Sequence, residues 1–163
     1  FGFIKFLNNN DFNENLHLKN LGPEPLGNLF NSAYFSQYIQ GRNRTIKDIL
    51  MDQKFVSGIG NIYANEILFL SKIKPMRNVK TLKIFELNNI LRFTKKVLEK
   101  AIKLGGSSIK DFSSSNGKKG EFQQHFNVYG KKGEPCSSVS CKGKIIKSSM
   151  SNRATFFCSL CQK

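Results

Sequence analysis

The spacing of apolar residues predicts helices through the middle of the chain. In residues 28–104 apolar side chains recur every three or four positions, which is typical of one face of an α-helix. The first two segments carry Phe30, Tyr34 and Tyr38, then Ile46, Ile49 and Leu50. The longest stretch, from Thr81 to Leu104, carries Ile84, Leu87, Leu91, Leu98, Ala101 and Ile102 on one face, with Lys95, Lys96, Lys100 and Lys103 largely off it. Gly105-Gly106 supplies a stop, so we predict a core helix with a basic outer surface.

The two ends of the chain have a different pattern. Residues 21–26, Leu-Gly-Pro-Glu-Pro-Leu, contain two prolines, which forbid a continuous helix and predict a linker. After a Ser/Gly/Lys-rich loop at 113–120, short apolar runs at 126–129, 144–146 and 155–157 are separated by glycines or polar turns and predict strands. The pattern therefore predicts a mostly α fold that ends in a small β module.

Four cysteines in this β module have the spacing of metal ligands. They are Cys136, Cys141, Cys158 and Cys161, two close pairs joined by 16 residues, which is long enough for a hairpin that brings the pairs together. Four thiolates favour one tetrahedral Zn²⁺. The alternative is two disulfides, but no secretory signal precedes the cysteines and the rest of the chain contains no cysteine. His17 and His125 are rival ligands, although four sulfurs already complete a closed structural site.

Net charge indicates a polyanionic partner. The chain carries 26 basic and 11 acidic residues, and residues 113–163 carry nine basic against two acidic. This balance is typical of nucleic-acid binding, while a solvated basic surface is the alternative reading. No apolar run approaches the roughly 20 residues that span a bilayer, so we expect an intracellular protein without a membrane partner.

The stretch from Asp52 to Glu66 is a candidate phosphate site. Gly58 and Gly60 permit a tight turn between two helical segments, and Asn61 is well suited to cap the second helix. A helix start with exposed amides, close backbone approach through glycine and a carboxamide side chain is a ready phosphate site. An ordinary glycine turn between packed helices is the alternative, and the third glycine of a dinucleotide site is missing.

Several motifs occur in order from residue 21 to the last residue. They are LGPEPL at 21–26, LMDQK at 50–54, GIGNIYA at 58–64, GGSSIKDF at 105–112, VYGKKGEPC at 128–136, RATFFC at 153–158 and CQK at 161–163. Together they resemble the formamidopyrimidine-DNA glycosylase family of base-excision repair enzymes. The sister endonuclease VIII branch shares the helical region and the finger, but the GPEPL, KDF and VYG motifs favour the formamidopyrimidine branch.

The resemblance implies a domain organisation. Residues 1–26 are then a remnant of an N-terminal domain and linker, and 27–112 a helix-two-turns-helix DNA-binding domain. Residues 113–125 become a flexible lid-like loop, and 126–163 a zinc finger built on a β-hairpin. The first cysteine pair, C-x4-C, is longer than the C-x2-C usual in the family, which affects the expected shape of that loop more than metal binding.

The resemblance also implies site residues. The implied DNA contacts are Arg42, Arg44, Lys54, Gly60, Asn61, Tyr129, Arg153 and Phe1. Arg153 matches the family's arginine at the tip of the finger, which contacts phosphates at the flipped nucleotide and assists δ-elimination, so it is the candidate catalytic residue. Phe1 matches a wedge that fills the gap left by the flipped base, with a core aromatic as the alternative. The implied cofactor is one structural Zn²⁺.

The implied function is removal of oxidised purines, namely 8-oxoguanine and formamidopyrimidines, from double-stranded damaged DNA, with β,δ-elimination at the abasic site. The family's N-terminal proline nucleophile, glutamate acid and β-elimination lysine have no counterpart in this sequence, which starts at Phe1 without a methionine. We therefore expect a monomeric C-terminal fragment that is inactive unless joined to the catalytic domain. It would act in the bacterial nucleoid or cytoplasm, or in a eukaryotic nucleus or DNA-containing organelle. The alternative is a stand-alone, non-catalytic, zinc-containing nucleic-acid-binding protein, and an upstream reading frame that begins Met-Pro-Glu would argue against it.

Overall fold

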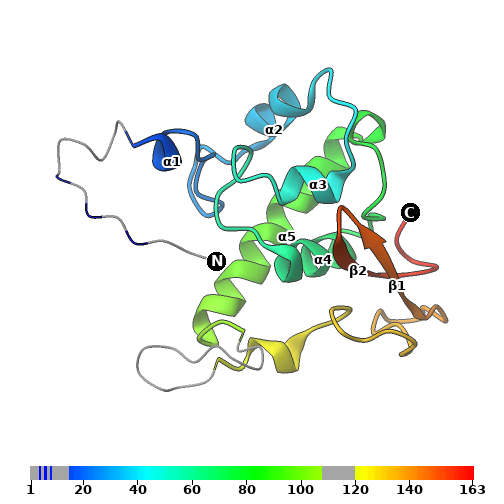
Figure 1. Cartoon of the computed structure of the whole chain (residues 1–163). Helices are drawn as coiled ribbons and strands as arrows, with labels where there is room; N and C mark the ends of the chain where they lie inside the picture. Colours follow the sequence, from blue (N-terminus) through cyan, green and yellow to red (C-terminus); the bar gives the residue numbers. More distant parts are fainter. Residues whose placement is uncertain (1–3, 5, 7, 9–14, 108–119) are drawn as a thin grey trace.

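The computed structural model describes residues 4, 6, 8, 15–107 and 120–163 (Figure 1). In chain order its elements are α1 (Leu16–Lys19), α2 (Ser32–Ile39), α3 (Ile46–Leu50), α4 (Asn61–Leu70), the 3-10 helix η2 (Val79–Thr81), α5 (Ile84–Lys103), the 3-10 helix η3 (Phe122–His125), β1 (Ile145–Met150) and β2 (Arg153–Cys158). A helical domain is therefore followed by a two-stranded hairpin, as the apolar pattern predicted. None of the helices in the described ranges is long and apolar enough to cross a membrane.

Helix α5 is the longest element and passes behind α3 and α4 in Figure 1. Its buried face packs against α2 and α4 through Leu87, Ile90, Leu91, Thr94, Val97, Leu98 and Ala101. The predicted stop is confirmed, because Gly105 has a φ of +69° and the Gly106 amide donates to the Ala101 carbonyl at 2.8 Å. Ile84 and Ile102 were wrongly predicted to be buried, since they lie in the first and last turns of α5 and are 58% and 67% exposed.

The segment at residues 21–26 forms no helix and is bound to the turn that follows α3. The Gly22 amide donates to the Gln53 carbonyl at 2.7 Å, and the Ser57 amide donates to the Pro23 carbonyl at 3.1 Å. A Cβ at Gly22 would lie 2.4 Å from the carbonyl carbon of Phe55. Phe55 itself lies in an aromatic cluster with Phe30, Tyr34, Phe35 and Tyr38. The predicted linker is thus a packed part of the turn.

Strands β1 and β2 are antiparallel and form the hairpin. Ser151 and Asn152 join them with φ values of +47° and +58°, the left-handed pair that a two-residue hairpin turn requires. The predicted strand at 126–129 was wrong, because its amides bond to the carboxylate of Glu66 instead of a neighbouring strand. A second apolar cluster joins Phe69 at the end of α4 to Val128, Cys136, Ile145, Phe156 and Cys158.

Candidate metal centre and nucleic-acid interface

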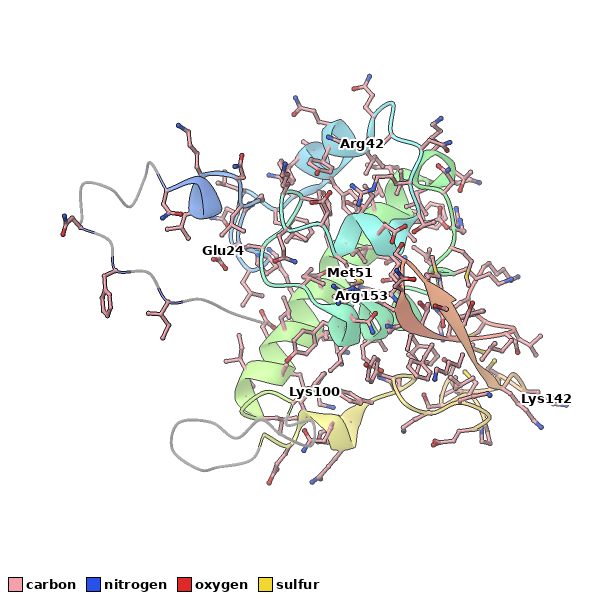
Figure 2. All side chains as sticks on the ribbon, in the orientation of Figure 1. Glu24, Arg42, Met51, Lys100, Lys142 and Arg153 are labelled. Atoms are coloured by element: carbon pink, nitrogen blue, oxygen red, sulfur yellow. The ribbon has the colours of Figure 1, made fainter. Side chains whose placement is uncertain are left out.

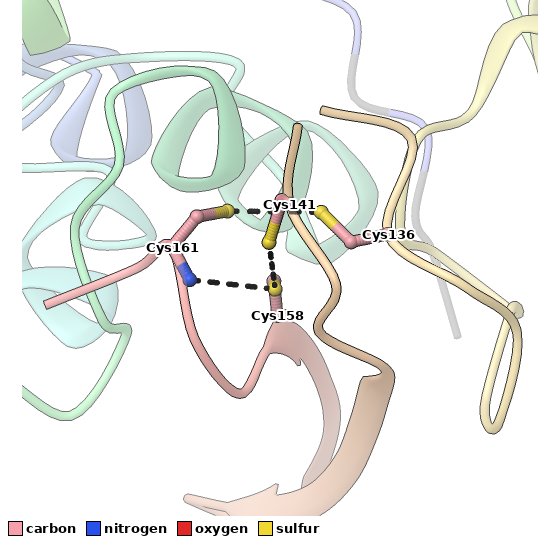
Figure 3. Close-up of side chains that lie close together, drawn as sticks. All are labelled: Cys136, Cys141, Cys158 and Cys161. Atoms are coloured by element: carbon pink, nitrogen blue, oxygen red, sulfur yellow. Dashed lines mark hydrogen bonds between the residues drawn. The ribbon is translucent and has the colours of Figure 1, made fainter. Parts of the chain in front are cut away.

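The four cysteine sulfurs come together at the base of the hairpin (Figure 3). All four Sγ atoms lie within 4.8 Å of one another. Cys136 Sγ and Cys161 Sγ are 3.7 Å apart, and Cys141 Sγ and Cys158 Sγ are 3.6 Å apart. A tetrahedral ion about 2.3 Å from each sulfur separates the sulfurs by about 3.8 Å. The cluster therefore has the size of a four-sulfur metal site, and the longer first pair does not prevent it from closing.

The thiols are free, so the alternative of two disulfides is not supported. A disulfide brings two sulfurs to about 2.0 Å, far closer than either pair here. His125 does not belong to the cluster and lies beside Lys96, Lys100 and Glu66 around a different cavity of about 200 Å³. The side chain of the other candidate, His17, lies outside the described part of the chain.

Backbone amides surround the sulfurs with hydrogen-bond donors. The amides of Ser138 and Gly143 donate to Cys136 Sγ and Cys141 Sγ, and those of Leu160 and Cys161 donate to Cys158 Sγ, at 3.4–3.5 Å. Burial opposes ionisation of the Cys158 thiol, but the Cys161 and Leu160 amides outweigh it and lower its pKa to about 7. Burial and the neighbouring Cys158 raise the pKa of Cys161 to about 12. A cation shared by the four sulfurs would bring all of them to the thiolate form.

Four side chains of the helical domain bind the hairpin near its turn. Asp48 Oδ1 accepts from Ser151 Oγ at 2.8 Å, and Asn61 Nδ2 donates to the Ala154 carbonyl at 2.9 Å. Lys47 Nζ donates to Thr155 Oγ1 at 2.6 Å, and Asn65 Oδ1 accepts from the Phe156 amide at 2.7 Å. These four bonds join α3 and α4 to almost consecutive positions of the turn and β2. They fix the backbone on both sides of Arg153, which lies between Ser151 and Ala154.

Arg153 is exposed at the turn of the hairpin. Figure 2 shows it at the end of the hairpin that faces α3 and α4, with Lys142 at the opposite end. Within the described ranges its guanidinium makes no hydrogen bond or ion pair. Burial lowers the pKa of Lys47 to about 8; the charge of Asp48 opposes this shift and the charge of Arg153 adds to it. Arg153 is therefore an exposed positive charge without a partner in the part of the chain that the structure describes.

The turn before α4 opens beside Arg153. Gly58 has a φ of +78°, and its amide donates to Gln53 Oε1 at 2.8 Å. The prediction that Asn61 caps α4 was wrong, because Gly60 is the N-cap and offers no side-chain hydrogen bond. Asn61 is the first helical residue, and one of its two amide hydrogens bonds to Ala154. The start of α4 therefore has no side-chain cap, which is the arrangement in which a helix N-terminus can accept an anion.

The other predicted DNA contacts differ in whether their side chains already bind other groups of the protein. Lys54 is exposed on the turn. The Arg44 guanidinium forms an ion pair with Asp52 at 2.6 Å and donates to the Asp48 carbonyl, which fixes it as a brace of the turn. Arg42 lies with its guanidinium 4.2 Å from the centre of the Tyr38 ring and donates to the Tyr38 carbonyl.

Tyr129 and Phe1 complete the predicted set. The Tyr129 ring packs edge-on against Phe126 and Phe156, with centroids 5.7 and 5.1 Å apart. Phe1 lies outside the described residues. Whether any of the predicted DNA contacts touches DNA stays a prediction.

Sequence reasoning missed the buried polar residues that hold the finger, by which we mean residues 126–163. These are Lys47, Asn65, Glu66 and Gln162, all at most 1% exposed. Gln162 accepts from the Cys158 amide and donates to the Ile73 carbonyl, both at 2.7 Å. A signal was present in α4, where Asn65 and Glu66 interrupt an otherwise apolar run.

Comparison with known proteins gives one consistent result. Residues 21–113 match the formamidopyrimidine-DNA glycosylase H2TH domain. The chain is 47% identical over 146 residues to a formamidopyrimidine-DNA glycosylase of Hydrogenovibrio crunogenus, which covers 90% of this chain and 51% of the relative. It is 42% identical over 163 residues to the protein of the same name from Listeria innocua, covering 100% and 59%. The chain thus spans little more than half the length of these relatives.

Solved structures agree with the sequence matches. The MutM (Fpg) protein of Thermus thermophilus superposes with a TM-score of 0.85 at 36% identity, covering 93% of this chain and 57% of that one. A variant of Lactococcus lactis Fpg in complex with Fapy-dG-containing DNA superposes with a TM-score of 0.86 at 35% identity, covering 95% and 56%. Another Lactococcus lactis Fpg structure is a complex with DNA that contains an abasic site.

Proposed function

Because the chain belongs to the formamidopyrimidine-DNA glycosylase family, we propose that it is the part of such an enzyme that grips damaged double-stranded DNA. The whole protein would remove oxidised purines and cleave the abasic site by β,δ-elimination. The relatives whose structures contain Fapy-dG or abasic DNA support this assignment. We place the base-removing step in the half of the relatives that this chain does not span.

One observation carries the proposal. The uncapped start of α4 lies beside Arg153, which has no partner among the described residues, because Asn61 bonds to the residue after Arg153. A helix start and a guanidinium are both good phosphate ligands, and two of them at a fixed separation suit successive phosphates of one strand. Lys54 and the second amide hydrogen of Asn61 would add contacts on the same face.

We propose that one structural Zn²⁺ is held by Cys136, Cys141, Cys158 and Cys161. The sulfur spacing and the four amide donors support this choice. The ion would supply no reaction chemistry, because four protein ligands leave no open position. Its role would be to close the base of the hairpin whose turn carries Arg153.

Arg153 is the proposed catalytic residue of this chain. Its charge would stabilise the phosphate at the flipped nucleotide and so favour departure of that phosphate in δ-elimination. Arg42 and Arg44 are proposed as outer phosphate contacts, with Arg44 limited by its ion pair to Asp52. Tyr129 is proposed to donate its hydroxyl to a phosphate.

The test is binding of the zinc-loaded chain to a duplex that contains a tetrahydrofuran abasic-site analogue, measured by fluorescence anisotropy. The same duplex without the lesion is the control. We expect the lesion duplex to bind more tightly, because a missing base lowers the cost of unstacking and bending. Equal binding of both duplexes, or none, would contradict the assignment.

A further inference from the structure

Glu66 is a buried carboxylate of α4 that holds a distant backbone segment. It is 1% exposed, and it accepts four hydrogen bonds. The amides of Asn127, Val128 and Tyr129 donate at 2.8, 3.0 and 2.9 Å, and Asn127 Nδ2 donates at 2.9 Å. No lysine, arginine or histidine of the described residues forms an ion pair with it. The amides therefore stabilise the buried charge, and the charge in turn orders the amides.

Three consecutive amides that point to one carboxylate make the chain turn. In a strand, successive amides point in opposite directions, so this segment cannot extend β-structure. The turn fixes the backbone of Tyr129, and its ring rests against Phe156 of β2. The Tyr129 hydroxyl has no hydrogen-bond partner among the described residues.

The residue of α4 that precedes Glu66 binds strand β2 of the finger. Asn65 accepts from the Phe156 amide, so consecutive residues of one helix fix β2 and the segment that carries Tyr129. Arg153 begins β2. Helix α4 thus anchors both the backbone of Tyr129 and the strand that begins with Arg153.

We propose that Glu66 is a positioning residue that sets where Tyr129 presents its hydroxyl on the finger that also carries Arg153, so that both groups meet the backbone of one duplex. This inference rests on the proposed function. A carboxylate is required because its two oxygens accept all four bonds, whereas glutamine has one acceptor oxygen and would turn an NH₂ group toward N–H donors. Glu66→Gln therefore disturbs the segment with almost no change in shape.

The first measurement needs no DNA. Val128 and Tyr129 donate to one oxygen of Glu66 and Asn127 donates to the other, so glutamine can satisfy only one of these two sets. Hydrogen exchange of Glu66→Gln should therefore show loss of protection at the Asn127 amide or at the amides of Val128 and Tyr129, while the Phe156 amide stays protected. Glu99→Gln, an exposed position of α5 with the same change of charge, is the control. Zinc content should be one per chain in all variants. Retained protection at all three amides, those of Asn127, Val128 and Tyr129, would overturn the proposal.

The second measurement is a double-mutant cycle with Tyr129→Phe on the tetrahydrofuran duplex. Loss of one hydroxyl-to-phosphate hydrogen bond should weaken binding about fivefold. Glu66→Gln should cost the same factor, and the double variant should bind no more weakly than either single variant. Binding of Glu66→Gln equal to that of Glu99→Gln, or losses that multiply, would show that Glu66 does not act through Tyr129.

The two measurements separate failure of this inference from failure of the proposed function. If the wild-type chain does not bind the duplex, the proposed function fails, and with it the role in binding. The exchange experiment then still decides whether Glu66 orders the segment. If Glu66→Gln does not fold, Glu66→Asp replaces it, and its shorter carboxylate should give partial loss of amide protection and weaker binding, whereas wild-type behaviour in both would overturn the proposal.

Discussion

Asn65→Leu tests how the finger is attached to the helices. Asn65 is fully buried, accepts from the Phe156 amide at 2.7 Å and donates to the Asn61 carbonyl at 2.7 Å. Leucine has a similar volume but cannot accept a hydrogen bond from the Phe156 amide, which would remain buried without a partner. The cost of such an unsatisfied group is about 1–3 kcal/mol. The Asn61 carbonyl retains its place in the helix, so its loss of a second donor should matter less.

The assay is urea unfolding of the zinc-saturated chain. We expect the free energy of unfolding to fall by about 2 kcal/mol with an unchanged m-value. The thermal midpoint should fall by about 4–8 °C, since about 1 kcal/mol corresponds to 2–4 °C in a chain of this size. The matched control is Asn88→Leu on the exposed side of α5, where a change within about 0.5 kcal/mol is expected. Equal effects of the two substitutions would refute the reasoning.

Three further results are expected. Metal analysis should find one zinc per chain, and a chelator should abolish amide protection in the finger before it does so in α5; zinc-free protein with an intact finger would remove the metal from the account. The Arg77 guanidinium, 2.5 Å from Glu86, lowers the pKa of that carboxyl below its usual 4.5. The ion pair therefore stabilises the fold above pH 4.5, and this stabilisation is lost as pH falls through the lowered pKa of Glu86. Glu86→Gln should flatten the acid limb of a plot of stability against pH, and an unchanged limb would argue against the pair. Gly22→Ala should destabilise by about 1–3 kcal/mol because its Cβ meets the Phe55 backbone, whereas Gly27→Ala should cost less, and the reverse order would be inconsistent with the packing.

Features that depend on local spacing were predictable. Helix α5 and its glycine stop follow from a repeat of apolar positions and from the freedom of Gly105 to adopt a positive φ. The cysteine cluster follows from two close pairs and a spacer that forms a hairpin. In each case the interacting residues are near one another in sequence or carry a chemistry that few alternatives share.

Features that depend on distant polar partners were not predictable. The apolar residues of 126–129 suit a strand, but a carboxylate 61 residues earlier in the chain takes the amides. Asn61 suits a helix cap, yet its side chain bonds to Ala154, 93 residues away. Periodicity contains no information about which buried polar side chain finds which backbone group, and these pairings place the candidate site.

The salt dependence of DNA binding by Arg153→Ala tests the central claim most directly, because the account requires this exposed guanidinium to meet a phosphate. On the tetrahydrofuran duplex the variant should bind more weakly, and the slope of log affinity against log salt should be shallower by about one unit. Arg92→Ala, which removes an exposed arginine of α5, should keep the wild-type slope. The same slope and affinity for Arg153→Ala and Arg92→Ala would contradict the claim that the hairpin turn grips DNA.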